Sequence, residues 1–124
     1  MKDNKFVILY VDDDQDMLDS LRIVLEANGY VMEEASSGEE GLKRYKTVKP
    51  DFVIVDLMME EVDAGTSLVK ELKALGNKVP VYMLSSVGDQ LNLQTDYNAL
   101  GLSGVFQKPM NFDVLIGTLK KKLG

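Results

Sequence analysis

The feature that most constrains the fold is a fivefold alternation of short apolar runs with segments of helical hydrophobic spacing. The first run, residues 6–11, is continuous and rich in strand-forming residues, as expected of a strand buried on both faces. The segment after it repeats apolar residues at helical spacing and stops at Asn28-Gly29. Strands that alternate with helices imply a parallel sheet covered by helices on both faces.

Four more strands are predicted, at residues 30–35, 52–55, 81–84 and 104–107. Ser37 is predicted to cap the helix after the second strand, and Asn111 to cap the last helix. Residues 89–100 are also predicted to be helical, although their apolar spacing is the weakest in the chain. The expected fold is α/β, a doubly wound five-stranded parallel sheet in three layers. We find no linker or internal repeat, so one domain is expected to fill residues 1–124.

The composition limits the chemistry of any site that this fold carries. The 124 residues include neither histidine nor cysteine, which excludes imidazole bases, thiol nucleophiles, disulfides and metal sites built on those side chains. A metal ion would be bound through oxygen, which favours Mg²⁺, Mn²⁺ or Ca²⁺. The net charge of −6 opposes binding to nucleic acid through charge alone. No apolar run approaches the length of a membrane span, so we expect a soluble cytoplasmic protein.

Polar side chains follow four of the predicted strands at the points where the strands end. They are Asp12, Asp13 and Asp14, then Asp56, then Ser85 and Ser86, and finally Lys108. Ligands of doubly wound sheets bind at the carboxyl ends of the strands, so we expect these side chains to share one site. Clustered carboxylates repel one another unless a hard cation lies between them, and Mg²⁺ fits such a site. The available nucleophile is then a carboxylate, and its attack on phosphorus would form an aspartyl phosphate.

Four motifs at these positions resemble the receiver domain of two-component response regulators, including the single-domain chemotaxis type. They are Val11-Asp12-Asp13, Val55-Asp56-Leu57-Met58-Met59, Met83-Leu84-Ser85-Ser86 and Phe106-Gln107-Lys108-Pro109. Their order and spacing agree with the family, and the resemblance covers nearly the whole chain. It implies a flavodoxin-like (βα)₅ three-layer sandwich, and we expect a single receiver domain with no effector domain.

The resemblance also implies roles for the acidic residues. Asp56 would accept a phosphoryl group from the phosphohistidine of a histidine kinase, in a reaction that requires Mg²⁺, with Mn²⁺ as the alternative cation. Asp13 and Asp56 would bind the metal directly, and Asp12 mainly through water. Met58 would add its backbone carbonyl oxygen to the metal. Such a domain catalyses its own phosphorylation and autodephosphorylation and does not turn over a substrate.

The phosphoryl group would be held by Ser85 and Lys108, which the resemblance places at its oxygens. The partners implied are a histidine kinase or phosphotransfer protein, and a downstream protein or a second copy of the chain that binds upon phosphorylation. Neither nucleic acid nor a membrane is expected as a direct partner.

Two positions depart from the family pattern and support an alternative function. Glu60 stands where the family usually has proline, in a loop one residue longer than usual. Val105 stands where the family commonly has an aromatic residue that takes part in the activation switch. Phe106 follows, but strand alternation predicts that it faces the opposite side of the sheet. The alternative is a pseudo-receiver that acts as a constitutive protein-interaction module.

Some of these residues have an ordinary structural interpretation. Asp14 is expected to be a helix N-cap and not a ligand, and Lys120 to Lys122 to be a solvated helix end. A flavodoxin-like cofactor carrier is disfavoured, because three aspartates after the first strand would repel a bound phosphate. A turnover phosphatase that used Asp56 would need a further acid or base and a capped pocket, and neither is visible in the sequence.

Overall fold

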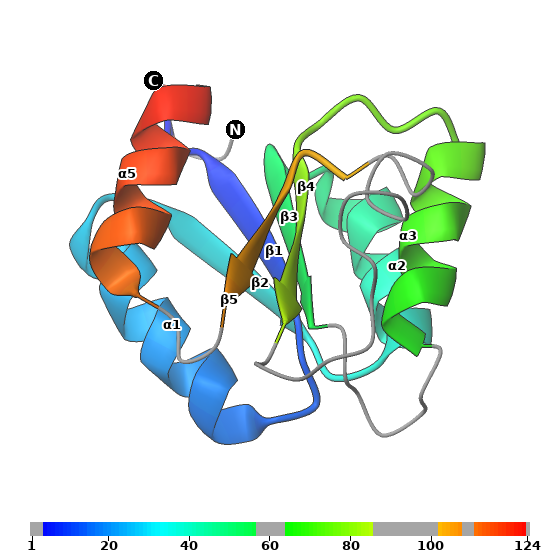
Figure 1. The fold of residues 1–124 in the computed structure, drawn as a ribbon, viewed down its shortest axis with the longest axis horizontal. Helices are drawn as coiled ribbons and strands as arrows, with labels where there is room; N and C mark the ends of the chain where they lie inside the picture. The colour runs from blue at the N-terminus through cyan, green and yellow to red at the C-terminus, as the bar shows by residue number, and fades with distance from the viewer. Residues whose placement is uncertain (1–3, 57–63, 86–101, 108–110, 124) are drawn as a thin grey trace.

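The computed structural model describes residues 4–56, 64–85, 102–107 and 111–123, which form a parallel sheet between two layers of helices (Figure 1). The strands are β1 (Val7–Val11), β2 (Val31–Ala35), β3 (Phe52–Asp56), β4 (Val81–Ser85) and β5 (Gly104–Gln107). The helices are α1 (Gln15–Ala27), α2 (Gly38–Val48), α3 (Ala64–Ala74) and α5 (Phe112–Leu123). The predicted α/β fold is confirmed, and the helix predicted at residues 89–100 lies outside the described residues.

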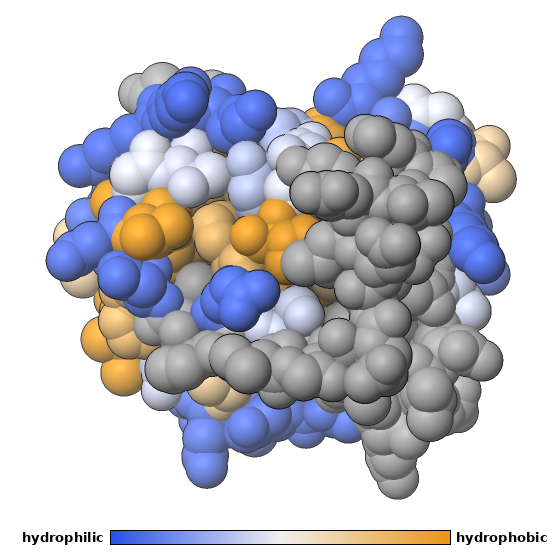
Figure 2. Space-filling view, viewed as in Figure 1, coloured by the Kyte–Doolittle hydropathy of each residue, from blue (hydrophilic) through white to orange (hydrophobic). Residues whose placement is uncertain are grey.

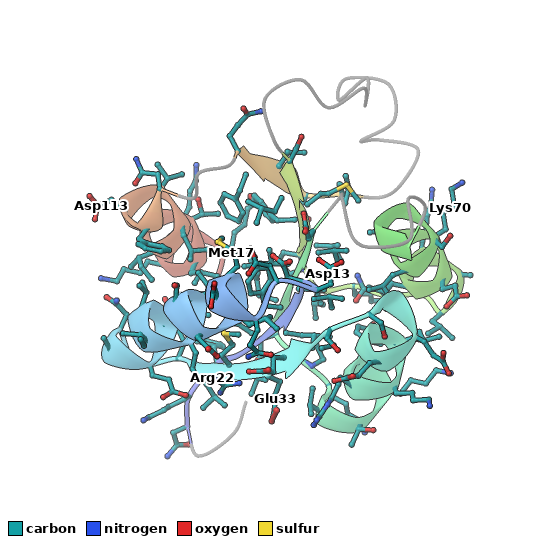
Figure 3. The ribbon with its side chains drawn as sticks, turned by 90° about the horizontal axis from the view of Figure 1, so that it is seen from below. Asp13, Met17, Arg22, Glu33, Lys70 and Asp113 are labelled. Carbon is teal, nitrogen blue, oxygen red and sulfur yellow. The ribbon has the colours of Figure 1, made fainter. Side chains whose placement is uncertain are left out.

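The strands lie in the order β2-β1-β3-β4-β5, and all neighbours are parallel. The chain leaves β1 toward β2 on one side and later returns to β3 on the other, so the order reverses between β1 and β3. Seen from the ends of the strands, α1 and α5 cover one face of the sheet, and α2 and α3 cover the other (Figure 3). Ligand sites of doubly wound sheets lie at this reversal, beyond the carboxyl ends of the strands.

Two apolar cores join the sheet to its helices. The core beneath α1 and α5 contains Ile8 and Tyr10 of β1, and the core beneath α2 and α3 contains Leu9 and Val11. Successive side chains point to opposite faces of a strand, and every residue of β1, β3 and β4 is buried. Double burial explains why these strands are continuous apolar runs in the sequence.

The helix boundaries follow the capping residues that the sequence predicts. The backbone N–H of Glu40 donates to Oγ of Ser37 at 3.1 Å, and that of Val114 donates to Oδ1 of Asn111 at 3.2 Å. Gly29, which follows the end of α1, has a φ of +87°, a left-handed conformation that glycine adopts without strain. The capping predictions at these helix ends are confirmed.

Aromatic rings are stacked across the strands on the α1 and α5 face. The ring centroids of Phe52 and Tyr82 are 5.1 Å apart, and those of Tyr82 and Phe106 are 4.7 Å apart. Gly104 lies beside Tyr82 in the sheet, and a Cβ at this position would overlap the tyrosine ring. On the surface, hydrophobic residues gather over the lower part of α5 and over β5 in the view of Figure 2. Among the described helices, none combines the length and the apolar character needed to cross a membrane.

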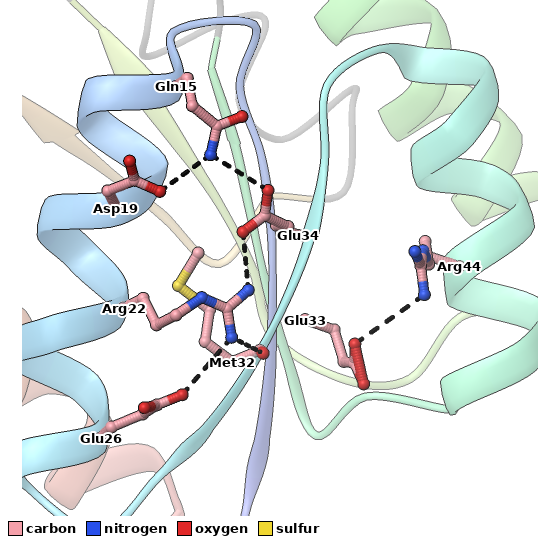
Figure 4. Close-up of polar contacts among 8 residues, drawn as sticks. All are labelled: Gln15, Asp19, Arg22, Glu26, Met32, Glu33, Glu34 and Arg44. Atoms are coloured by element: carbon pink, nitrogen blue, oxygen red, sulfur yellow. Dashed lines mark hydrogen bonds and ion pairs between the residues drawn. The ribbon is translucent and has the colours of Figure 1, made fainter.

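The edge strand β2 carries a network of ionic contacts, the β2 edge network (Gln15, Asp19, Arg22, Glu26 and Glu34) (Figure 4). The guanidinium of Arg22 donates to Oε1 of Glu34 at 2.7 Å and to the backbone carbonyl of Met32 at 2.9 Å. It also lies 3.4 Å from a carboxylate oxygen of Glu26. Edge strands expose unpaired backbone groups, and Arg22 provides a partner for one of them.

Candidate functional site

The buried polar and charged side chains of the described residues lie at the ends of neighbouring strands. Asp12 directly follows β1, Asp56 is the last residue of β3, and Ser85 is the last residue of β4. Their exposed fractions are 0%, 2% and 3%. Because β1, β3 and β4 are consecutive in the sheet, the structure brings these three predicted residues to one edge, at the reversal of the strand order.

Three carboxylates converge at this edge and form the carboxylate cluster (Asp12, Asp13 and Asp56). One oxygen from each lies within 4.8 Å of the others. Asp13 is exposed and lies between the two helix layers (Figure 3). Like charges this close repel strongly where burial lowers the dielectric constant. An all-oxygen donor set of two buried carboxylates and one exposed carboxylate fits Mg²⁺ or Mn²⁺, which keep water or phosphate oxygens as further ligands.

The carboxylate of Asp12 is held at both oxygens by the protein. The hydroxyl of Tyr10 donates to Oδ2 of Asp12, and both side chains are buried. The backbone N–H of Asp14 donates to Oδ1 of Asp12 at 2.9 Å. These two bonds fix the orientation of a carboxylate that has no exposure to solvent.

Tyr10 is a site residue that the sequence reasoning missed. Burial raises the pKa of its hydroxyl above the ordinary value of 10, and the hydrogen bond to Asp12 and the charges of Asp12 and Asp56 raise it further. The phenol is therefore neutral near pH 7, where its hydroxyl donates to the carboxylate of Asp12. The signal was the spacing: residues two apart in a strand share a face, so a tyrosine two positions before Asp12 can reach its carboxylate.

Asp14 has the structural role that its position predicts. Its Oδ1 accepts hydrogen bonds from the backbone N–H groups of Asp16 at 3.0 Å and Met17 at 3.4 Å. Its backbone is extended, as an N-cap requires. The prediction that Asp14 caps α1 is confirmed, and the same residue donates its N–H to Asp12.

Two adjacent residues of β5 point to opposite faces of the sheet. Val105 is half-buried and packs against the core beneath α2 and α3. Phe106 is buried in the core beneath α1 and α5, where it stacks on Tyr82. The prediction that Phe106 faces away from the side of Val105 is confirmed, because the two residues belong to different cores.

Several predicted positions lie outside the described residues. They are Met58, Glu60, Ser86 and Lys108. The roles given to Met58 and Lys108 therefore remain predictions from the sequence.

Solved structures similar to this chain include chemotaxis proteins. The chain superposes on chemotaxis protein CheY4 of Vibrio cholerae with a TM-score of 0.86 and 27% identity, covering 96% of this chain and 99% of that one. It superposes on a CheY-like receiver domain protein of Methanospirillum hungatei with a TM-score of 0.86 and 28% identity, covering 97% and 94%. These likenesses support the flavodoxin-like arrangement of the sheet and helices.

Similar sequences include both long and short regulators. Response regulator MprA of Mycolicibacterium vanbaalenii is 31% identical over 116 residues, which are 94% of this chain and 49% of that protein. The chain thus spans about half the length of this relative. Chemotaxis protein CheY of Bacillus subtilis is 32% identical over 117 residues, which are 94% of this chain and 96% of that protein.

The family itself follows from a match along most of the chain. Residues 8–120 match the family model described as the response regulator receiver domain. This range contains the carboxylate cluster, the whole of β2 to β5, and β1 from its second residue. The chain belongs to the response regulator receiver domain family.

Proposed function

We propose that this receiver domain accepts a phosphoryl group on Asp56 from the phosphohistidine of a histidine kinase or phosphotransfer protein. The observation that carries the proposal is the convergence of Asp12, Asp13 and Asp56 at the ends of β1 and β3 in a chain of this family. Among these carboxylates, Asp56 lies at the end of a central strand. Its carboxylate is the proposed nucleophile.

The reaction is a transfer between two protein side chains. An oxygen of Asp56 forms a bond to phosphorus while the bond from phosphorus to the imidazole nitrogen of the donor breaks, which returns a neutral histidine after proton uptake. A hydroxyl at Ser85, buried beside Asp56 in the sheet, is proposed to donate to an oxygen of the transferred group. Lys108 is proposed to bind another of these oxygens through its ammonium group.

Mg²⁺ is the proposed cofactor, with Mn²⁺ as its substitute. Asp13 and Asp56 would hold it directly, Asp12 through water, and Met58 through its carbonyl oxygen. When bound, it would neutralise charge that develops on the phosphoryl oxygens. In its absence the chain must keep three acidic side chains together, and Tyr10 and the N–H of Asp14 stabilise one of them.

Phosphorylation is proposed to change binding to a downstream protein or to a second copy of the chain. The chain carries 20 acidic and 14 basic residues, and this excess of acid disfavours direct binding to nucleic acid.

A second candidate function is supported by β5. Val105 offers no ring where the family commonly has one, and Phe106 is engaged in the opposite core. A pseudo-receiver that binds its partner constitutively would tolerate this arrangement. In that case beryllofluoride and Mg²⁺ would leave partner binding and oligomeric state unchanged, as measured by light scattering after size exclusion.

The test of the first proposal uses acetyl phosphate as the phosphoryl donor. Intact-mass spectrometry should find one added phosphoryl group on the wild-type protein when Mg²⁺ is present and none when it is chelated. Asp56→Asn should abolish the addition, while the control Asp113→Asn, at an exposed position of α5, should keep it. An equal addition to the Asp56→Asn variant would overturn the assignment.

A further inference from the structure

We infer that Tyr10 is a positioning residue for metal binding, acting through the carboxylate of Asp12. The inference rests on the proposed function, because it takes the carboxylate cluster to be a Mg²⁺ site. The observation behind it is the hydrogen bond from the Tyr10 hydroxyl to Oδ2 of Asp12, between two side chains with no exposed surface. Neither side chain is free to exchange this contact for one with bulk water.

The position of the hydroxyl is set by the core. Tyr10 belongs to the apolar core beneath α1 and α5, and its exposed fraction is 0%. Close-packed interiors hold aromatic rings in one rotamer, so the oxygen at the tip of the ring is delivered to a defined place. Asp12 directly follows β1, two positions after Tyr10, and the Tyr10 hydroxyl donates to its carboxylate, so the ring and the carboxylate lie on the same side of the chain.

Asp12 can still accept further hydrogen bonds, which explains how it would bind a metal ion through water. An ionised carboxylate has about four lone-pair sites, and the Tyr10 hydroxyl and the Asp14 N–H take one on each oxygen. A carboxylate held in this way is suited to accept hydrogen bonds from metal-bound water. Tyr10 thus supports the water-mediated role proposed for Asp12, while Asp13 and Asp56 remain for direct contact.

Removal of the hydroxyl should disturb the site more than the fold. Tyr10→Phe keeps the ring in the core and deletes one donor, which leaves Oδ2 of a buried carboxylate without that bond beside the charge of Asp56. Partners that orient metal-binding carboxylates typically contribute 10- to 100-fold to metal affinity. We expect Tyr10→Phe to weaken Mg²⁺ binding by about 10-fold.

The experiment titrates the whole chain with Mg²⁺ by calorimetry and with Mn²⁺ by electron paramagnetic resonance. The matched control is Tyr30→Phe, because Tyr30 is a buried tyrosine of the same core. It precedes β2 and so lies at the amino ends of the strands, away from the carboxylate cluster at their carboxyl ends. This control variant should bind both ions as the wild type does. Circular dichroism verifies that each variant is folded before titration.

A double-mutant cycle separates positioning from a general effect on the core. If Tyr10 acts through Asp12, Tyr10→Phe should weaken Mg²⁺ binding in the wild type but not in an Asp12→Asn background. Should the phenylalanine variant not fold, ¹³C-labelled tyrosine rings in the wild type provide the readout. The Tyr10 signal should then shift with the Mg²⁺ titration while the Tyr30 signal stays in place.

The outcomes distinguish this inference from the proposed function. If the wild type binds Mg²⁺ and Tyr10→Phe binds it equally well, or the Tyr10 signal does not shift, the role of Tyr10 is overturned and the metal site stands. If the wild type does not bind Mg²⁺ or Mn²⁺, both are overturned. A tenfold loss that disappears with Asp12→Asn supports the inference.

Discussion

Carboxylates occur in two contrasting settings in this domain. At the strand ends, oxygens of Asp12, Asp13 and Asp56 lie within 4.8 Å of one another, and two of the three side chains are buried. At the outer edge of β2, Glu34 is partly exposed and lies 2.7 Å from a guanidinium nitrogen of Arg22. The first setting gathers charges of one sign, and the second pairs opposite charges.

The same carboxylate chemistry therefore serves ligand binding in one region and stability of the fold in the other. In the β2 edge network, the cation is a side chain of the fold, and it also covers a backbone carbonyl of an edge strand. In the carboxylate cluster, the acids repel, so an external cation would gain from all of them at once.

Mg²⁺ should stabilise the folded domain through the carboxylate cluster. A ligand at 100 times its dissociation constant adds about 2.7 kcal/mol to the free energy of unfolding when it binds only the folded state. Urea denaturation with and without Mg²⁺ measures this gain. Glu34→Gln should retain the gain and Asp56→Asn should lose most of it; equal gains in both variants would place the metal elsewhere.

Asp13→Asn should change stability in opposite directions with and without metal. In metal-free protein, removal of one charge relieves repulsion at 4.8 Å or less, and we expect a gain of about 1 kcal/mol after screening at this exposed position. With saturating Mg²⁺, the variant should be less stable than the wild type, because it has lost a ligand. Denaturation curves under both conditions provide the comparison, and a variant less stable in both would contradict the repulsion argument.

Arg22→Met should weaken the fold and leave metal binding unchanged. The substitution keeps an apolar stem but deletes the contacts to Glu34, Glu26 and the carbonyl of Met32. A cost of roughly 0.5–1 kcal/mol is expected for such a half-exposed cluster. The control is Lys43→Met, whose ion pair with Glu39 spans 3.6 Å between largely exposed side chains. If both variants had the same free energy of unfolding, the β2 edge network would not stabilise the fold.

The Arg22–Glu34 pair should also add a small pH dependence. The hydrogen bond from Arg22 lowers the pKa of Glu34 below its ordinary value of 4.5. Because the folded pKa is lowered, the pair stabilises the fold fully above the unfolded value and loses this contribution as the pH falls through the folded value. The stability difference between wild type and Glu34→Gln should be a few tenths of a kcal/mol at pH 6 and should shrink toward pH 3. A difference that grew with acidity would contradict the direction of the shift.

The fold could be predicted from the sequence because its signals are local and repeated. Strands that are buried on both faces need continuous apolar runs, and such runs occur at residues 6–11 and 52–55. In the structure, β1 and β3 agree with these two runs to within one residue at each end. Polar caps such as Ser37 and Asn111 marked helix starts for a similar reason, since a backbone N–H at a helix start needs a nearby acceptor. The order of the strands required a topological rule as well as the pattern.

The polar residues of the site could be predicted from the sequence, but the residue that orients Asp12 could not. Strand ends indicated Asp12, Asp56 and Ser85, and the topology placed them on one edge. Tyr10 lies within an apolar run, and an aromatic residue in such a run indicates core packing. The sequence pattern does not show that its hydroxyl makes a specific hydrogen bond. The contact of Arg22 with the backbone carbonyl of Met32 could not be predicted either, because no sequence motif indicates which side chain of a helix reaches the backbone of an edge strand.

The most direct test of the central contrast is a crystal structure of the chain with Mg²⁺ and beryllofluoride. We expect beryllofluoride on the carboxylate of Asp56, and a metal ion about 2.0–2.1 Å from oxygens of Asp13 and Asp56. Asp12 should be linked to that ion through water and should still accept the hydrogen bond from Tyr10. A metal ion bound at the β2 edge network, or beryllofluoride on another carboxylate, would contradict this account.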